Sequence, residues 1–281
     1  MTLPENGLPW PPPAHAAAAA RMRMHSAWYA GDTDQLTRIY QRERKGAPVN
    51  RPSQYRGGLV GIAARTFWGR PTPEGEPPTK LHIPIAADIA ATSADLLFSE
   101  PPALTVKHLG TQDRLTELLL GGGSDATLLE AAEVASALGG VYLRVSWDAD
   151  IAPDRPILNA VHGDQGWPEF SYGMLRAVTF WSEVGRDGQT VWRALERHEP
   201  GVILHGLYRG TEERLGTQVG LGAHDATRDL TPEVDGVPGR LCAVYVPNMR
   251  PHRVERGSWL GRSDYTSQEP LMDALDEVWT S

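Results

Sequence analysis

Residues 175–208 read LRAVTFWSEVGRDGQTVWRALERHEPGVILHGLY, and this stretch decides the fold. Apolar, β-branched and aromatic residues dominate three runs, Leu175–Glu183, Gln189–His198 and Val202–Tyr208, which predicts three strands. Between the first two runs lies Arg186–Gln189, whose Asp-Gly pair accepts a positive φ at low cost and is typical of a hairpin turn. The stretch therefore predicts neighbouring antiparallel strands.

Further strands are predicted on both sides of this stretch. Ile157–Val161 is one, and Val141–Trp147 alternates so that every second residue shares one face. Cys242–Val246 is a strand that Pro247 ends, and residues 209–240 read as loop-rich. Ala103–Lys107 is expected to form a short strand.

Helices precede the sheet. Alanines at 16–20 favour a helix from about residue 14 to 29, and Asp32 can cap a second helix that ends near Lys45. The expected later helices are Ile83–Phe98, which Pro101 and Pro102 end, Thr111–Leu120, 124–138 and Pro270–Trp279. The pattern predicts an α+β fold with N-terminal helices, a mostly antiparallel sheet and the start of a further helix.

The first thirteen residues contain five prolines and cannot form a helix. We predict that residues 1–13 are a mobile or draped tail and that residues 14–281 form one α+β region. Residues 46–79 are rich in Gly and Pro and are expected to be irregular. The last residues of the chain still follow the apolar pattern of a helix, so we expect the chain to be incomplete at the C-terminus.

Composition excludes several classes of protein. The 281 residues are 41% hydrophobic and 22% charged, which allows a sizeable core. No run approaches the roughly 18 apolar residues of a membrane span, so no membrane partner is expected. The single Cys242 excludes a disulfide framework and any multi-cysteine metal site.

Charge is distributed unevenly along the chain. Residues 1–70 hold ten Lys or Arg and four Asp or Glu, whereas residues 71–281 hold 17 and 31, within a net charge of −8. A basic arm beside an acidic body favours contact between the arm and an acidic partner, such as a neighbouring copy. A solvated basic helix is the alternative interpretation.

Motifs for catalysis are absent from the sequence. It contains no phosphate loop of the GxxxxGK[ST] type, no GxGxxG, no HExxH and no GxSxG. His198 and His205 flank an expected hairpin, but isolated histidines are far more common than metal ligands. We therefore expect a structural or interaction protein, with no catalytic residue, no metal and no cofactor.

Nine tryptophans point to interaction surfaces, because Trp is enriched in the buried anchors of interfaces. Trp147, Trp181 and Trp192 are expected to fill the core. Trp167 and Trp259 lie in polar sequence and are the better interface candidates.

Three groups of motifs together resemble portal proteins of tailed bacteriophages, in the form common in phages and prophages of actinobacteria. The first is Leu81–Ala90 (LHIPIAADIA) with Ala94–Pro102 (ADLLFSEPP); the second is Gly139–Val145 (GGVYLRV) with Asp164–Gln165 and Trp167–Pro168; the third is Val246–Pro251 (VPNMRP), Gly261–Tyr265 (GRSDY) and Asp273–Asp276 (DALD). The resemblance covers most of residues 20–281, and it depends on the order and spacing of these motifs.

The resemblance implies a non-enzymatic subunit of a ring, typically of twelve copies, at one vertex of the phage head. Such a ring is built in the host cytoplasm and remains in the virion as the head–tail connector. Its implied partners are other copies of itself, capsid and scaffold proteins, the terminase large subunit, the head–tail adaptor and the double-stranded DNA that passes through the channel. Portal proteins are usually longer, so this chain would be mostly the outer wing, without the channel-lining helices.

A ring needs two different complementary faces on each subunit. We expect five arginines to meet the acidic body of the adjacent subunit or a capsid partner, namely Arg21, Arg23, Arg38, Arg42 and Arg44. Two other classes stay open: a Trp-rich module that binds sugars or peptides, and a phage-encoded hydrolase, which would need a clustered acidic or His/Asp site.

Overall fold

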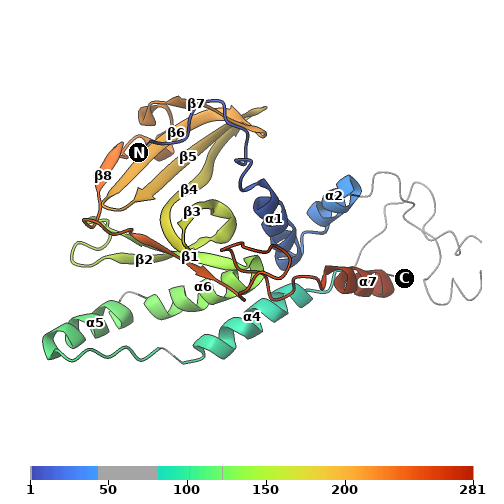
Figure 1. The fold of residues 1–281 in the computed structure, drawn as a ribbon, viewed down its shortest axis with the longest axis horizontal. Coiled ribbons are helices and arrows are strands. Elements are labelled where there is room, and N and C mark those ends of the chain that lie inside the picture. Colours follow the sequence, from blue (N-terminus) through green and yellow to red (C-terminus); the bar gives the residue numbers. More distant parts are fainter. Residues whose placement is uncertain (1, 44–81, 101, 122, 281) are drawn as a thin grey trace, which may run out of the picture. The chain divides into compact units, whose positions relative to one another are not determined.

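The computed structural model describes residues 2–43, 82–100, 102–121 and 123–280. The segment 46–79, predicted to be irregular, lies outside these ranges. The chain divides into two compact units: the larger comprises residues 1–23 and 90–264, and the smaller comprises residues 24–89 and 265–281. Figure 1 shows the elements of both units.

The larger unit contains two antiparallel sheets (Figure 1). One has the strand order β3-β4-β5-β6-β7, with β8 paired to β6, and the other has the order β2-β1-β9. The strands are β1 (Gly140–Ser146), β2 (Ile157–His162), β3 (Gly166–Ser171), β4 (Met174–Asp187), β5 (Thr190–Glu199), β6 (Val202–Thr211), β7 (Arg214–Val219), β8 (Glu233–Asp235) and β9 (Ala243–Pro247).

The helices follow the expected order. They are α1 (Ala16–Ala30), α2 (Thr33–Glu43), α4 (Ile85–Phe98), α5 (Leu109–Gly121), α6 (Ser124–Leu138) and α7 (Glu269–Thr280). Asp32 caps α2 as predicted, because its carboxylate accepts a 2.9 Å hydrogen bond from the backbone N–H of Gln35. The predicted α+β class, with helices first, antiparallel strands next and a helix at the end, is confirmed.

Three strands were not expected from the sequence, and one expected strand is absent. β3 contains Pro168 and a register shift between Glu169 and Phe170, and both weaken its strand pattern. β7 and β8 are short segments of the stretch that was predicted to be loop-rich. Conversely, Ala103–Val106 lie in no strand, Lys107 lies at a bend, and the segment pairs with no strand of the described chain.

The main core of the larger unit lies between the two sheets. Tyr142 and Tyr245 come from the β2-β1-β9 sheet, Phe180 comes from β4, and Val161 and Val178 complete the cluster. Tyr142 packs edge-on against Phe180 at 5.2 Å between ring centroids. Burial raises the pKa of Tyr245 to about 12, so this phenol stays neutral in the core.

Helix α6 covers the opposite face of the smaller sheet, where it packs on β1 and β2. Its apolar side is buried through Val134 and Leu138. Gly139 ends the helix at φ 88° and donates its N–H to the carbonyl of Ala135. A Cβ at the next residue, Gly140, would overlap the Tyr245 ring, so β1 starts where only glycine fits.

The Pro-rich N-terminal segment lies along β7 and is not a mobile tail in its described residues. The Gly7 N–H donates to the Gly216 carbonyl at 2.7 Å, and the Trp10 N–H donates to the Glu213 carbonyl at 2.8 Å. The Trp10 ring packs edge-on against Trp167 and Trp181, with centroids at 4.5 and 4.9 Å. This strap, residues 2–13, covers the free edge of the larger sheet.

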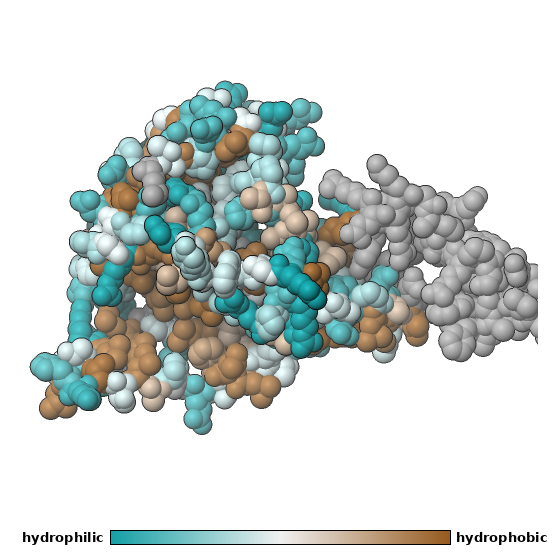
Figure 2. Space-filling model, viewed as in Figure 1, coloured by the Kyte–Doolittle hydropathy of each residue, from teal (hydrophilic) through white to brown (hydrophobic). Residues whose placement is uncertain are grey.

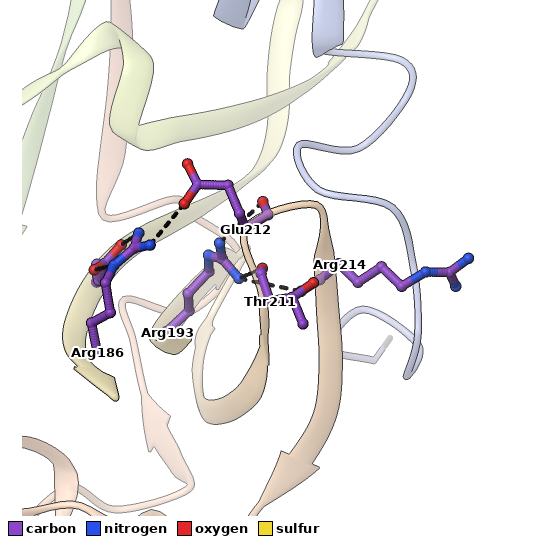
Figure 3. Close-up of polar contacts among 6 residues, drawn as sticks. Arg186, Arg193, Thr211, Glu212 and Arg214 are labelled. Carbon is purple, nitrogen blue, oxygen red and sulfur yellow. Dashed lines mark hydrogen bonds and ion pairs between the residues drawn. The ribbon is translucent and has the colours of Figure 1, made fainter. Parts of the chain in front are cut away.

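A buried guanidinium fixes the hairpin beneath the strap. Arg193 on β5 is 3% exposed and donates hydrogen bonds to the carbonyls of Thr211 and Arg214 in the β6–β7 turn (Figure 3). Its guanidinium also lies 4.4 Å above the Trp10 ring. Burial lowers the pKa of Arg193. At the surface beside it, Arg186 bridges Glu183 and Glu212.

The smaller unit joins the second half of α1 to α7. His25 contacts the Glu269 carboxylate at 3.1 Å and His82 contacts that of Asp276 at 2.9 Å. The Tyr265 hydroxyl donates to the His25 carbonyl at 2.8 Å. Burial alone would raise the pKa of Glu269, but the hydrogen bond with His25 and backbone N–H groups hold it below its usual value. The two His–carboxylate contacts tie segments that are far apart in the sequence.

Candidate interaction surfaces

The arm, defined as residues 96–121, comprises the end of α4, an extended segment and α5 (Figure 1). None of its described side chains is buried. Leu96 and Leu109 are each 80% exposed and Leu97 is 69% exposed, and Leu104 and Val106 add to the same apolar surface. Figure 2 shows apolar residues gathered along α4, α5 and the segment that joins them.

Among the described residues, the arm is held to the rest of the chain by contacts of α5 with α6 and by a hydrogen bond from Arg114 to the Asp154 carbonyl, and these leave its leucines exposed. Helix α5 has 13 residues, and isolated helices of that length are marginal in water. Monomeric proteins also rarely expose contiguous apolar surface of more than a few hundred Å². The arm is therefore a segment whose burial requires another surface.

One side chain holds the extended segment of the arm in place. The side-chain amide of Gln112 on α5 accepts from the Val106 N–H at 2.8 Å and donates to the Leu104 carbonyl at 3.1 Å. These two contacts imitate the pairing of a neighbouring strand along one edge of the segment.

The smaller sheet ends in an apolar edge strand. Val244 and Val246 on β9 are 52% and 40% exposed, and Val145 on β1 is also exposed. Residues 241–249 carry no charge. Edge strands are commonly protected by charged side chains, and β9 has none.

A polar cleft of about 350 Å³ opens between β2 and the face of β4, β5 and β6. On its wall the Arg144 guanidinium contacts the Glu196 carboxylate at 3.0 and 3.1 Å, and that carboxylate also contacts the buried ring of His198. Burial alone would raise the pKa of Glu196, but the His198 contact and the Arg144 charge bring it below its usual value. The charges of Arg144 and Glu196 therefore neutralise each other in the wall of the cleft.

The structure brings the two histidines onto adjacent strands without forming a metal centre. His205 on β6 lies opposite Glu196, and His198 on β5 lies opposite Ile203. In the described ranges, no group of three or more His, Cys, Asp or Glu side chains is placed to hold a metal ion.

The five arginines expected at an interface lie in different environments. Arg21 forms an ion pair with Glu255 of its own chain at 2.5 Å, so its charge is already partnered. Arg23 is exposed on α1 and its charge acts on Asp164, and Arg38 is exposed on α2. Arg42 belongs to α2, but its side chain lies outside the described part, as does Arg44 entirely.

The two tryptophans expected at an interface also differ. Trp167 is 7% exposed and packs in a core cluster with Leu195, Tyr208 and Leu215, so its assignment to an interface is wrong. The strap covers it through Trp10, a contact that its polar flanking sequence does not reveal. Trp259 is 41% exposed, and the Arg250 guanidinium lies 5.0 Å from its ring. Trp259 therefore stays an interface candidate.

Trp147 is 60% exposed, contrary to the expected role in the core. It follows β1 directly, beyond the last residue paired with β2. The sequence pattern does not reveal the arm directly, and its one signal is the expected strand Ala103–Lys107, which pairs with no strand among the described residues.

None of the described helices is both long and apolar enough to cross a membrane. A scan against protein-family models finds no match to this chain, and a search of curated proteins finds no relative of significant similarity.

Proposed function

We propose that this chain is a structural subunit of a bacteriophage portal ring, the head–tail connector through which double-stranded DNA enters and leaves the phage head. It acts by assembly and carries no catalytic site or cofactor. The motif resemblance supplies the identity of the ring, and the arm supplies the physical support for assembly.

The observation that carries the proposal is the unburied apolar surface of the arm. Its 26 residues, 96–121, are comparable to the roughly 20–30 residues that one partner contributes to a standard interface. Burying its exposed leucines and valine against a neighbour would gain roughly 25 cal/mol per Å² of apolar surface.

Assembly through the arm suits a closed ring. An arm that meets a different surface on the next copy makes a heterologous contact, and such contacts close when the rotation between copies divides a full turn. The described chain has both parts of such a contact, the arm and an apolar sheet edge elsewhere on the larger unit.

The remaining proposed partners follow from ring function. They are capsid and scaffold proteins, the terminase large subunit, the adaptor and the DNA in transit, and the assembled ring belongs to the virion.

The proposal is tested by placing a charge on the arm. Leu109→Glu in the complete gene product is expected to shift the assembly toward single subunits in mass photometry, because burying an unpaired carboxylate is costly. Tyr172→Glu is the matched control, since Tyr172 is 94% exposed at the β3–β4 turn. Assembly that withstands Leu109→Glu as well as it withstands Tyr172→Glu would contradict this role of the arm.

A further inference from the structure

We propose that Ala103–Lys107 of one subunit adds to the open edge of β9 in a neighbouring copy, as a fourth strand of the β2-β1-β9 sheet. The proposal rests on the proposed ring function and names the contact that joins adjacent subunits. It follows from which backbone N–H and C=O groups of the two segments already form hydrogen bonds.

The hydrogen bonds of β9 define its open edge. The Val145 N–H donates to the Cys242 carbonyl, and the Asn248 N–H donates to the Gly139 carbonyl. Hydrogen-bonded pairs alternate along an antiparallel ladder, so residues 242, 244, 246 and 248 face β1. The N–H and C=O groups of Ala243 and Tyr245, and the C=O of Pro247, therefore point away from β1. Within the described chain, β9 pairs with β1 alone.

The extended segment of the arm has the complementary pattern. Gln112 occupies the Val106 N–H and the Leu104 carbonyl, which lie on one edge. In an extended chain the groups of residues 103 and 105 then point to the other edge, and Lys107 lies at the bend that ends the segment. In the described chain these residues lie in no strand and pair with no other strand. Ala103 and Thr105 on the arm thus match Pro247 and Tyr245 on β9.

An antiparallel register aligns both backbone and side chains. It pairs Ala103 with Pro247, Thr105 with Tyr245 and Lys107 with Ala243. Pro247, which lacks an N–H, stands at the end of this ladder and needs only to accept from Ala103.

The same register places apolar side chains opposite each other. Leu104 faces Val246 and Val106 faces Val244, in the closely spaced pairs where cross-strand contact is strongest. Val244 lies in turn beside Leu143 of β1, so Leu104 and Val106 extend an apolar face already present. Helix α6 packs on the β1 and β2 part of that face and leaves Val244 and Val246 exposed.

A second copy of the chain is the occupant that fits. Residues 103–106 carry no charge and neither do residues 241–249, so the charge in this register is that of Lys107, at the end of the ladder. The whole arm is also large enough for one side of a stable interface.

Disulfide trapping tests the register. In a Cys242→Ser background, Leu104→Cys and Val246→Cys are combined in the complete gene product. A closely spaced pair has its Cα atoms about 4.5 Å apart, which a disulfide can span. Mild oxidation is expected to give a ladder of covalent multimers on non-reducing gels. Mixing the two single variants is expected to give covalent dimers only.

The matched control is Leu104→Cys with Val244→Cys, which is two residues out of register and is expected to cross-link at least several-fold less. Rings in micrographs without covalent multimers, or a disulfide confined to single chains, would overturn the strand addition and leave the ring function standing. Neither rings nor multimers would overturn both proposals.

Discussion

Asp164 is a buried carboxyl group that costs the folded chain stability. Its Oδ1 atom is buried with no hydrogen-bond partner among the described residues, while its backbone carbonyl accepts from the Trp181 indole. Burial raises the pKa of Asp164, and the charge of His162, a hydrogen bond from its own backbone N–H and the charge of Arg23 offset this only in part. A carboxyl whose pKa is higher in the folded than in the unfolded chain weakens folding at any pH where it must ionise.

Asp164→Asn is therefore expected to raise the free energy of unfolding at neutral pH. The gain is present above the folded-state pKa and disappears as the pH falls below the unfolded value near 3.8, where both states bind the proton. Chemical denaturation at several pH values measures it. A variant that is less stable than the parent at pH 7 and at pH 4 alike would show that the carboxylate is satisfied.

At the scale of elements, the strap is the feature with the largest expected effect on stability. Trp10 fills the space between Trp167 and Trp181 and lies under the Arg193 guanidinium. Trp10→Ala is expected to cost about 3 kcal/mol, because it removes a large ring from the packed cluster. Urea unfolding followed by circular dichroism measures the loss.

Trp147→Ala makes the same chemical change at a ring that is 60% exposed, and it is expected to stay within about 0.5 kcal/mol of the parent. Equal losses in the two variants would mean that the strap does not hold the sheet.

The elements that depend on residues close together in the sequence were predicted from the sequence pattern. The Asp187-Gly188 turn and the apolar runs beside it give β4, β5 and β6, and the register pairs Asp187 with Thr190 as a two-residue hairpin requires. Trp167 could not be placed in the same way, because its burial depends on Trp10, more than 150 residues earlier. Nor could Ala103–Lys107, whose strand pattern finds no partner strand in the described ranges.

For the whole molecule, the charge asymmetry of the sequence is only partly available for assembly. Arg21 forms an ion pair with Glu255 of the same chain, whereas Arg38 is exposed on α2. Of the five arginines expected at an interface, the candidates that the structure describes as exposed are therefore Arg23 and Arg38. The apolar arm becomes the stronger candidate for the subunit contact, because its leucines are exposed in the described part of the chain.

Negative-stain micrographs of the complete gene product test whether the chain assembles into a ring. We expect closed rings with a central hole, in class averages that share one subunit number, and we expect Leu109→Glu to abolish them. A uniform population of single particles from the unmodified protein, at micromolar concentration and physiological salt, would contradict it.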